Sequence, residues 1–243
     1  MNAQLPSFDN ALIEGASQFG FSLDESQVTD LTLLVDQLLD WNQRMNLTAV
    51  RDPHDIAIKH IIDSMTCLRV VPFPEGASVL DVGTGAGFPG LVLSALRRDL
   101  RLTLLDSTNK KLAFVEHVAR LLSLAHAKVA FGRAEEAGRL PEHREHYDIV
   151  VARAVAPMRI LAELCLPFTR PGGHFLAMKG PNLRDEMNNA EHTISVLGGQ
   201  ILEPILFQLP FGGGDRAIVP IFKAKPTPSA YPRLYRDIRR QPV

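Results

Sequence analysis

Cysteines, long apolar runs and a leader segment are scarce or missing in this sequence, and each absence excludes a class of protein. The two cysteines, Cys67 and Cys165, lie far apart and form no C-x-x-C pair, so neither a disulfide framework nor a zinc site is indicated. No apolar run approaches the roughly 20 residues that span a bilayer. The N-terminus lacks the basic and apolar segments of a signal peptide. We therefore expect a cytoplasmic protein that binds neither a membrane nor a metal.

The composition is otherwise that of an ordinary globular protein, with 46% hydrophobic and 22% charged residues among 243. This length allows one large domain, or one domain with an appendage. Residues 1–74 carry four basic and ten acidic side chains, and residues 75–222 are balanced. Residues 223–243 carry six basic side chains against Asp237 alone. A basic tail on a neutral body favours a polyanionic partner, and a solvated tail without a partner is the equal alternative.

Helical and strand patterns divide the chain into two parts. Before residue 75 we expect helices at 8–20, at 22–43, and from Asp52 to about Val71. From residue 78 onward, short apolar runs alternate with helical stretches at the interval of βαβ units. The expected parallel strands are 79–82, 101–106, 127–131, 147–152 and 173–178. The expected helices among them are 88–98, 108–124, 157–166 and 183–197. Strands at 201–209 and 217–223 then form a hairpin.

Five parallel strands followed by a hairpin is the order of a seven-stranded methyltransferase sheet. We therefore predict an α/β fold with a Rossmann-like sheet of this type. Residues 1–74 would be an N-terminal helical extension, 75–225 the main domain and 226–243 a basic tail. Prolines 226, 228 and 232 predict that the tail is irregular and extended.

A glycine-rich turn joins the first expected strand to its helix. Residues 79–90 read Val-Leu-Asp-Val-Gly-Thr-Gly-Ala-Gly-Phe-Pro-Gly. The dinucleotide fingerprint requires a third glycine where Phe88 stands. The spacing G-x-G-x-G, with Asp81 two residues before Gly83, resembles motif I of S-adenosylmethionine (SAM) methyltransferases. The acid suits the cationic amino group and sulfonium of that ligand. An ordinary glycine-rich turn is the alternative, and the pattern favours SAM.

The ends of the next two strands carry further candidate contacts, because ligands of doubly wound sheets lie beyond the carboxyl ends of the strands. Asp106 comes at the end of the second strand, about 20 residues after the glycines. An acid at this position can accept hydrogen bonds from both ribose hydroxyls. A helix N-cap is its alternative role, although Ser107 or Thr108 could also serve there. After the third strand, Ala134 and Glu135 could meet the adenine edge.

The end of the fourth strand narrows the chemistry. It reads Ala-Arg-Ala-Val-Ala-Pro around Arg153 and lacks the Asn-Pro-Pro-Tyr of enzymes that methylate exocyclic amines. Neither cysteine stands in a loop suited to methylation of pyrimidine C5. The remaining option is a nucleophile that needs no deprotonation, and guanine N7 is one. Positioning and electrostatics would suffice for methyl transfer to such an atom.

A polar group is expected on one face of the third helix. His60, Asp63 and Ser64 stand at i, i+3 and i+4. They are too few to bind a metal by themselves. They can face a ligand, and a surface hydrogen-bonded group is the commoner outcome.

Several motifs together resemble the bacterial GidB/RsmG family, which methylates N7 of a guanine in 16S ribosomal RNA. The similarity covers about residues 40–225. Its motifs are Met-Asn-Leu-Thr at 45–48, His-Ile-Ile-Asp-Ser at 60–64, the loop 81–90, and the stretches 106–111, 133–135, 152–154 and 178–180. The resemblance implies direct, in-line methyl transfer from SAM without a general base, to 16S rRNA or the 30S subunit. We also expect a monomer.

The resemblance and the loop motif together assign residues to three roles. The expected cofactor contacts are Asp81, Gly83, Gly85, Phe88, Asp106, Ser107, Thr108, Ala134, Glu135 and Arg153. Arg153, His60 and Asp63 would shape the pocket and orient the base. The expected RNA contacts are Lys110, Lys111, Arg133, Lys179, Arg184 and Arg233. Each of these charges alone is more often solvated, and their clustering near strand ends favours RNA.

Two other functions remain open at this point. A small-molecule methyltransferase would share the cofactor loop, but no lid or extra substrate domain is visible beyond the N-terminal helices. A non-catalytic RNA-binding protein could keep the fold, and the intact loop with Asp81 and Asp106 speaks against it. Titration with SAM separates the last function from the first two.

Overall fold

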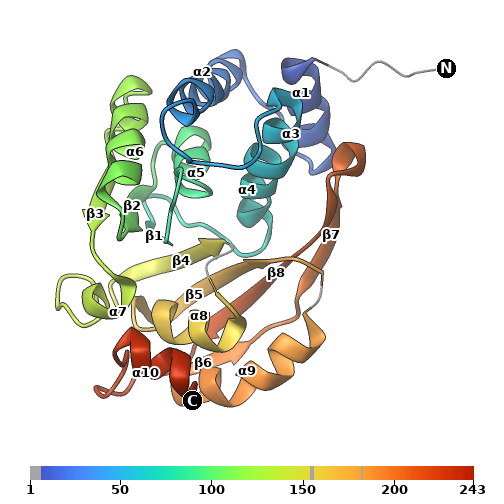
Figure 1. The fold of residues 1–243 in the computed structure, drawn as a ribbon. Helices are drawn as coiled ribbons and strands as arrows, with labels where there is room; N and C mark the ends of the chain where they lie inside the picture. Colours follow the sequence, from blue (N-terminus) through green and yellow to red (C-terminus); the bar gives the residue numbers. More distant parts are fainter. Residues whose placement is uncertain (1–6, 154–155, 182) are drawn as a thin grey trace.

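The fold is organised by one mixed β-sheet. A computed structural model describes residues 7–153, 156–181 and 183–243, and the described strands follow the order β3-β2-β1-β4-β5-β8-β6 (Figure 1). The parallel part consists of β1 (Ser78–Val82), β2 (Arg101–Asp106), β3 (Ala127–Phe131), β4 (Tyr147–Arg153) and β5 (Thr169–Lys179). The strand order reverses between β1 and β4, which places a crevice beyond their carboxyl ends.

The two faces of the sheet bury two separate cores, because successive strand residues point to opposite sides. Val79, Leu104 and Val151 face one core, while Leu80 and Val150 face the other. The first core also contains α1 (Phe8–Gln18), α2 (Glu25–Asn42), α5 (Gly90–Leu96) and α6 (Asn109–Leu121). The second contains α8 (Met158–Cys165), α9 (Arg184–Val196) and α10 (Tyr235–Arg240). Both faces are therefore covered by helices, as parallel sheets require.

The expected helix from Asp52 onward is present but changes its winding three times. It comprises α3 (Pro53–Ile56), a π-helical stretch (Ala57–Ile62), α4 (Asp63–Met65) and a 3-10 turn (Thr66–Arg69). Asp52 caps its start, and its side chain accepts a hydrogen bond from the amide of Asp55 at 3.0 Å. Such π-helical turns are frequent at functional sites, and this one contains His60.

The hairpin that ends the sheet contains one strand more than predicted. The expected strand 201–209 is divided into β6 (Gly199–Ile201) and β7 (Ile205–Leu209). Both pair with the same edge of β8 (Gly214–Lys223), since Ile218 pairs with β7 on one side and with β5 on the other. Pro204, which has no amide hydrogen to donate, lies in the break. The seven-position sheet order is thus retained, with one position interrupted.

The C-terminal tail is ordered, which corrects the expectation of an extended segment. After Pro232 it forms α10, whose Ile238 is fully buried in the second core. The guanidinium of Arg233 donates to the buried carboxylate of Glu163 at 2.6 and 2.9 Å. Arg144 donates to the carbonyl groups of Thr227 and Tyr231. Proline spacing indicated the irregular part correctly, but burial of one isoleucine stabilises a helix beyond it.

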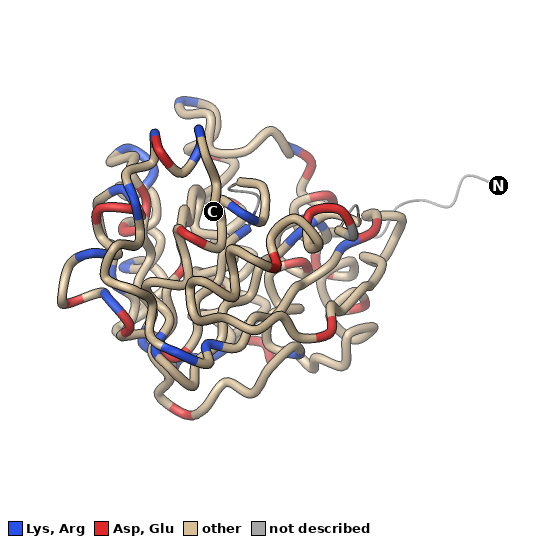
Figure 2. Tube along the Cα trace, turned by 90° about the horizontal axis from the view of Figure 1, so that it is seen from below, with Lys and Arg blue, Asp and Glu red and all other residues tan. Residues whose placement is uncertain are grey.

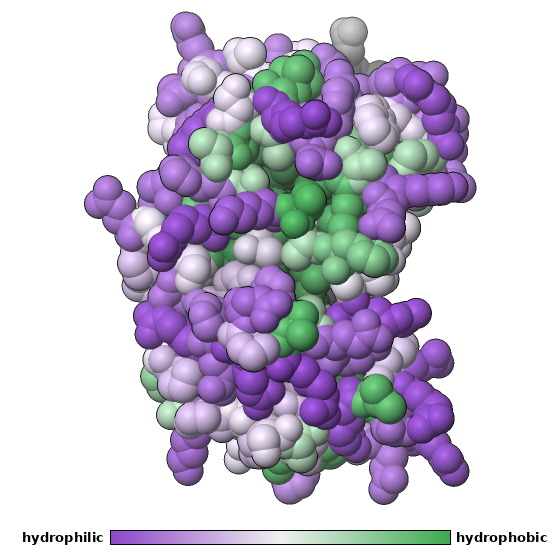
Figure 3. Space-filling view, turned by 90° about the vertical axis from the view of Figure 1, so that its left-hand side faces the viewer, coloured by the Kyte–Doolittle hydropathy of each residue, from purple (hydrophilic) through white to green (hydrophobic). Residues whose placement is uncertain are grey.

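No helix among the described residues is long and apolar enough to cross a bilayer. On the side where β3 forms the sheet edge and α6 and α7 (Ala134–Ala137) lie, hydrophilic residues surround a band of apolar residues across the middle (Figure 3).

Candidate functional site

A pocket of about 380 Å³ lies beyond the carboxyl ends of β1 to β4. Its size is within the range of small-molecule sites. Each strand end contributes to it, as do α8 and α10. Its lining is Val82, Gly83, Leu105, Asp106, Ser107, Thr108, Lys111, Gly132, Arg133, Ala134, Glu135, Arg153, Leu164 and Tyr235. Six expected cofactor residues are therefore gathered here, together with Arg153: Gly83, Asp106, Ser107, Thr108, Ala134 and Glu135.

The glycine loop has a backbone that only glycine adopts freely. Gly83, Gly85 and Gly87 have φ of +71°, +59° and +87°. A Cβ added at Gly85 would meet nothing nearer than the carbonyl oxygen of Gly83, at 3.9 Å. The loop therefore leaves an open cradle beside the strand ends, into which a ligand can approach the backbone.

Asp81, expected to contact the cofactor, lies beneath this loop and bonds to it. Its carboxylate accepts hydrogen bonds from the Thr84 hydroxyl at 2.7 Å and the Gly90 amide at 2.9 Å. The side chain is fully buried, and burial raises the pKa of Asp81 to about 6. In the described part of the chain, Asp81 does not line the pocket. Its position indicates that it holds the loop against the start of α5.

Asp106 has the geometry expected of a ribose-binding acid. Its two oxygens accept hydrogen bonds from the amides of Gly85, at 3.0 Å, and Thr108, at 2.8 Å. Thr108 is the N-cap of α6, so Asp106 does not serve in that role. A carboxylate has about four lone-pair positions, and two remain for hydroxyl groups of a ligand. Asp106 thus ties the glycine loop to β2 while facing the pocket.

The other end of the pocket offers groups for a nucleobase. Ala134 begins α7, so its amide belongs to the turn in which helical amides lack partners. Glu135 is buried within the pocket lining. The pocket thus offers Asp106 to two hydroxyl groups, the glycine loop to a chain that lies along it, and the Ala134 amide with Glu135 to the edge of a base. This set of donors and acceptors fits an adenosine ligand such as SAM.

A second pocket of about 540 Å³ adjoins the first. Arg153 lines both and marks their junction. The remaining lining comes mainly from the π-helical segment with the start of α4, from β5 and the residue after it, and from α9 and β8. It consists of Val50, Lys59, His60, Asp63, Met178, Lys179, Gly180, Glu186 and Arg216. The two pockets together suit a cofactor and a second substrate that meet at Arg153.

Arg153 is held in place by Asp63. One guanidinium nitrogen donates to the Asp63 carboxylate and to the Lys59 carbonyl, each at 3.1 Å. Arg216 approaches the other Asp63 oxygen at 3.6 Å, so two cations share one buried carboxylate. Burial raises the pKa of Asp63, and the two arginine charges oppose that effect. Arg216 was not identified from the sequence, because only the pairing of β5 with β8 brings it to this site.

His60 is neutral in this setting. Its Nδ1 lies 3.0 Å from the Lys59 carbonyl and its Nε2 lies 2.8 Å from the Thr48 hydroxyl. A carbonyl only accepts, so we assign the proton to Nδ1, and Nε2 accepts from Thr48. Burial, followed by the charge of Arg153, lowers the pKa of His60 to about 4.

Phe88 lies against both His60 and Arg153. Its ring stacks on His60 with centroids 5.0 Å apart, and the Arg153 guanidinium lies 5.3 Å from its centroid. Phe88 and Gly85, both expected as cofactor contacts, are outside the pocket lining that the described residues form. Phe88 instead supports the two side chains at the junction, and Gly85 donates to Asp106.

The expected RNA-binding residues have different environments. Lys110 and Lys111 stand in the first turn of α6, and the Arg133 side chain is 59% exposed. Lys179 donates to Glu186 at 2.6 Å and to the Ala156 carbonyl at 2.8 Å.

The other two members of this set, Arg184 and Arg233, differ from the lysines. Arg184 begins α9, and its side chain lies outside the described part of the structure. Arg233 uses its guanidinium on Glu163, so its geometry assigns it to anchoring the tail instead of to a phosphate contact.

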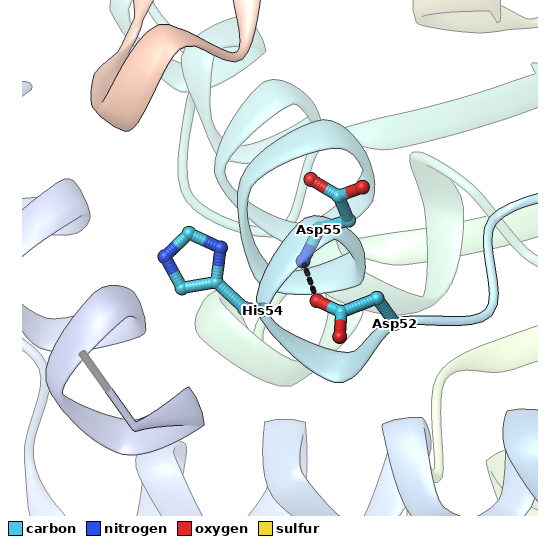
Figure 4. Close-up of side chains that lie close together, drawn as sticks. All are labelled: Asp52, His54 and Asp55. Carbon is cyan, nitrogen blue, oxygen red and sulfur yellow. Dashed lines mark hydrogen bonds between the residues drawn. The ribbon is translucent and has the colours of Figure 1, made fainter. Parts of the chain in front are cut away.

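A group of possible metal ligands is explained by local structure. Asp52, His54 and Asp55 each place one possible ligand atom within 4.8 Å of those of the other two (Figure 4). Asp52 caps the helix, and Asp55 pairs with Lys59 at 2.9 Å. The His54 ring packs against Phe211, with centroids 5.6 Å apart. We assign these side chains to the helix start.

Comparisons with known proteins point in the same direction as this geometry. Residues 27–208 match the family model described as GidB, rRNA small subunit methyltransferase G. A relative from Symbiobacterium thermophilum is 47% identical over 232 residues, which cover 93% of this chain and 94% of the relative. One from Alkaliphilus metalliredigens is 42% identical, covering 96% and 97%. Both are named ribosomal RNA small subunit methyltransferase G.

Solved structures show the same fold at low sequence identity. TrmN from Thermus thermophilus has a TM-score of 0.53 at 18% identity, covering 67% of this chain and 48% of that one. A predicted O-methyltransferase from Agrobacterium tumefaciens has a TM-score of 0.54 at 18% identity, covering 67% and 81%. The Rossmann-like methyltransferase fold predicted from the strand order is confirmed.

Proposed function

Because the chain belongs to the GidB family of small-subunit ribosomal RNA methyltransferases, it is a SAM-dependent RNA methyltransferase, and we propose that it methylates N7 of a guanine in 16S rRNA. The observation that carries this proposal is the junction of the two pockets. The only imidazole there among the described lining residues is His60, which is held neutral by burial and two hydrogen bonds. Guanine N7 has a free lone pair at neutral pH and needs no base.

The first pocket would hold the cofactor, which supplies a methyl group attached to a sulfonium. Asp106 would accept the ribose hydroxyls with the lone pairs that its two amide partners leave free. The Ala134 amide and Glu135 would meet the adenine edge. Gly83 and the cradle at Gly85 would face the methionine part. Asp81 supports this arrangement from beneath.

The second pocket would hold the guanine, with Arg153 between base and cofactor. Methyl transfer to N7 spreads positive charge over the reacting groups, so an unbalanced guanidinium nearby would oppose it. Asp63 compensates this charge by pairing with Arg153 at 3.1 Å, and it also orients the guanidinium. His60, neutral and stacked on Phe88, forms part of the wall. The residues therefore position the base, exclude water and balance charge, which is sufficient for direct transfer.

Basic side chains around both pockets would contact the RNA backbone. Lys110, Lys111 and Arg133 lie at the cofactor side, and Lys179 and Arg184 come from the segment beside the second pocket. We further propose that the protein acts as a monomer in the cytoplasm, on 16S rRNA or the 30S subunit.

Methyl transfer from labelled SAM to purified 30S subunits tests this function. We expect label in 16S rRNA with the wild-type protein and none with Arg153→Ala, while Arg44→Ala, which alters an exposed arginine on α2's C-terminal side, should behave as wild type. Label that enters a small metabolite and not RNA would favour a small-molecule methyltransferase. SAM binding without any transfer would favour a non-catalytic RNA-binding role.

A further inference from the structure

A third pocket, of about 620 Å³, lies between α7 and α10. It shares Arg133, Glu135 and Tyr235 with the cofactor pocket, so the two are adjacent. The rest of its lining is Glu136, Arg236, Arg239 and Arg240. Of the residues given a role from the sequence, only Glu135, for the cofactor, and Arg133, for RNA, line this pocket; the arginines of α10 were expected only as part of a basic tail.

The charge in this pocket is positive and incompletely paired. Four arginines face two glutamates. Arg236 pairs with Asp237 at 3.2 Å and Arg133 lies 4.0 Å from Glu135, but among the described residues Arg239 and Arg240 have no carboxylate within 4.0 Å. Seen from the side of α10, the Lys and Arg positions of the trace are concentrated on the half of the molecule away from the N-terminus (Figure 2).

The arginines of α10 are presented by a fixed element. Ile238 is fully buried between them, and the preceding Arg233 is bonded to Glu163, whose side chain is 1% exposed. Charge on a helix's last turn also stabilises its dipole, which would account for Arg239 and Arg240 alone. That effect does not account for Arg133, which reaches the same pocket from the segment after β3. The convergence of guanidinium groups from two distant segments indicates an anionic ligand.

We propose that the pocket between α7 and α10 binds a phosphate group of the RNA substrate, beside the cofactor and across it from the guanine pocket. This inference rests on the proposed function. Guanidinium groups match phosphate oxygens with paired donors, which is why arginine is common at such sites. The RNA strand would pass over the mouth of the cofactor pocket, from Arg153 on one side to α10 on the other. Tyr235 would form the wall between cofactor and phosphate.

The test is the salt dependence of binding to labelled 16S rRNA, measured with SAM present for the wild type and the double variant Arg239→Ala with Arg240→Ala. Each phosphate contact contributes about 0.7 to 0.9 to the slope of log affinity against log salt concentration. We expect the slope to become shallower by about 0.7 to 0.9 in the variant, which corresponds to the loss of one phosphate contact. The matched control, Arg120→Ala with Lys128→Ala, removes the same charge from exposed positions at α6 and β3, and should keep the wild-type slope.

A charge-preserving pair, Arg239→Lys with Arg240→Lys, covers the case in which alanine disturbs α10. The slope for this pair should differ from that of the wild type by less than about half of what one phosphate contact contributes. An unchanged slope in the alanine pair, or an equal loss in the control or lysine pair, overturns the phosphate site. Absence of methyl transfer to RNA by the wild-type protein would instead defeat the proposed function, so the two failures are distinguishable.

Discussion

Replacing Asp106 by alanine tests the assignment of the cofactor pocket in the most detail. The carboxylate is 8% exposed and accepts two backbone amides, from Gly85 and Thr108. Its removal would leave ligand hydroxyls without an acceptor and release the glycine loop from β2. Loss of a partner to a buried hydrogen-bonding group costs about 1–3 kcal/mol, so the dissociation constant for SAM should rise by about 5- to 150-fold.

Isothermal titration of SAM into both proteins measures this change, and an analogue separates its two causes. S-adenosylhomocysteine should bind the wild type more tightly than its 2′-deoxy analogue does, because the analogue lacks one hydroxyl. Asp106→Ala should not distinguish the two ligands. If it binds SAM within about twofold of the wild type, or still distinguishes the two ligands, the ribose is held elsewhere.

Three further predictions follow from the packing around the pockets. The single-turnover rate of methyl transfer should be flat between about pH 6 and 9, because the pKa of His60 is about 4 and it stays neutral there; a step in that range that His60→Ala abolishes would contradict it. Truncation after Lys225 should weaken SAM binding in titration as well as RNA binding, since it removes Tyr235 from the pocket wall; unchanged SAM affinity would contradict that contact. Glu163→Ala should lower the free energy of unfolding by about 3 kcal/mol in chemical denaturation, because it leaves Arg233 without its carboxylate partner. Loss of the exposed Arg44–Asp40 pair in Asp40→Ala should cost under about 1 kcal/mol. Equal losses in the two variants would show that the tail anchor contributes little.

The prediction for the truncated chain differs from what the sequence alone indicates. Viewed as a charged, proline-containing tail, residues 226–243 suggest RNA contacts and no effect on SAM. The structure brings Tyr235 into the cofactor pocket through the burial of Ile238 and the pairing of Arg233 with Glu163. Those contacts join residues about 70 positions apart in the chain, and local sequence patterns do not contain them.

Local patterns succeeded where the backbone itself decides the position. Strand ends in a parallel sheet are adjacent by construction, so Gly83, Asp106 and Glu135 could be placed at one pocket from spacing alone. The burial of Asp81 under the loop could not be predicted, because spacing cannot tell an acid that faces a ligand from one that supports the loop above it. Arg216 was not identified because the pairing of β5 with β8, and not its neighbours in sequence, brings it to Asp63.

The most direct test of the central claim is the chemical identity of the methylated product. After transfer to 30S subunits, 16S rRNA should be treated with borohydride and aniline, which cleave the strand at N7-methylguanosine. We predict cleavage at one guanine that depends on both the protein and SAM, and that is absent with Arg153→Ala. Methylated RNA that resists this cleavage would contradict the account and indicate base-assisted methylation of another atom.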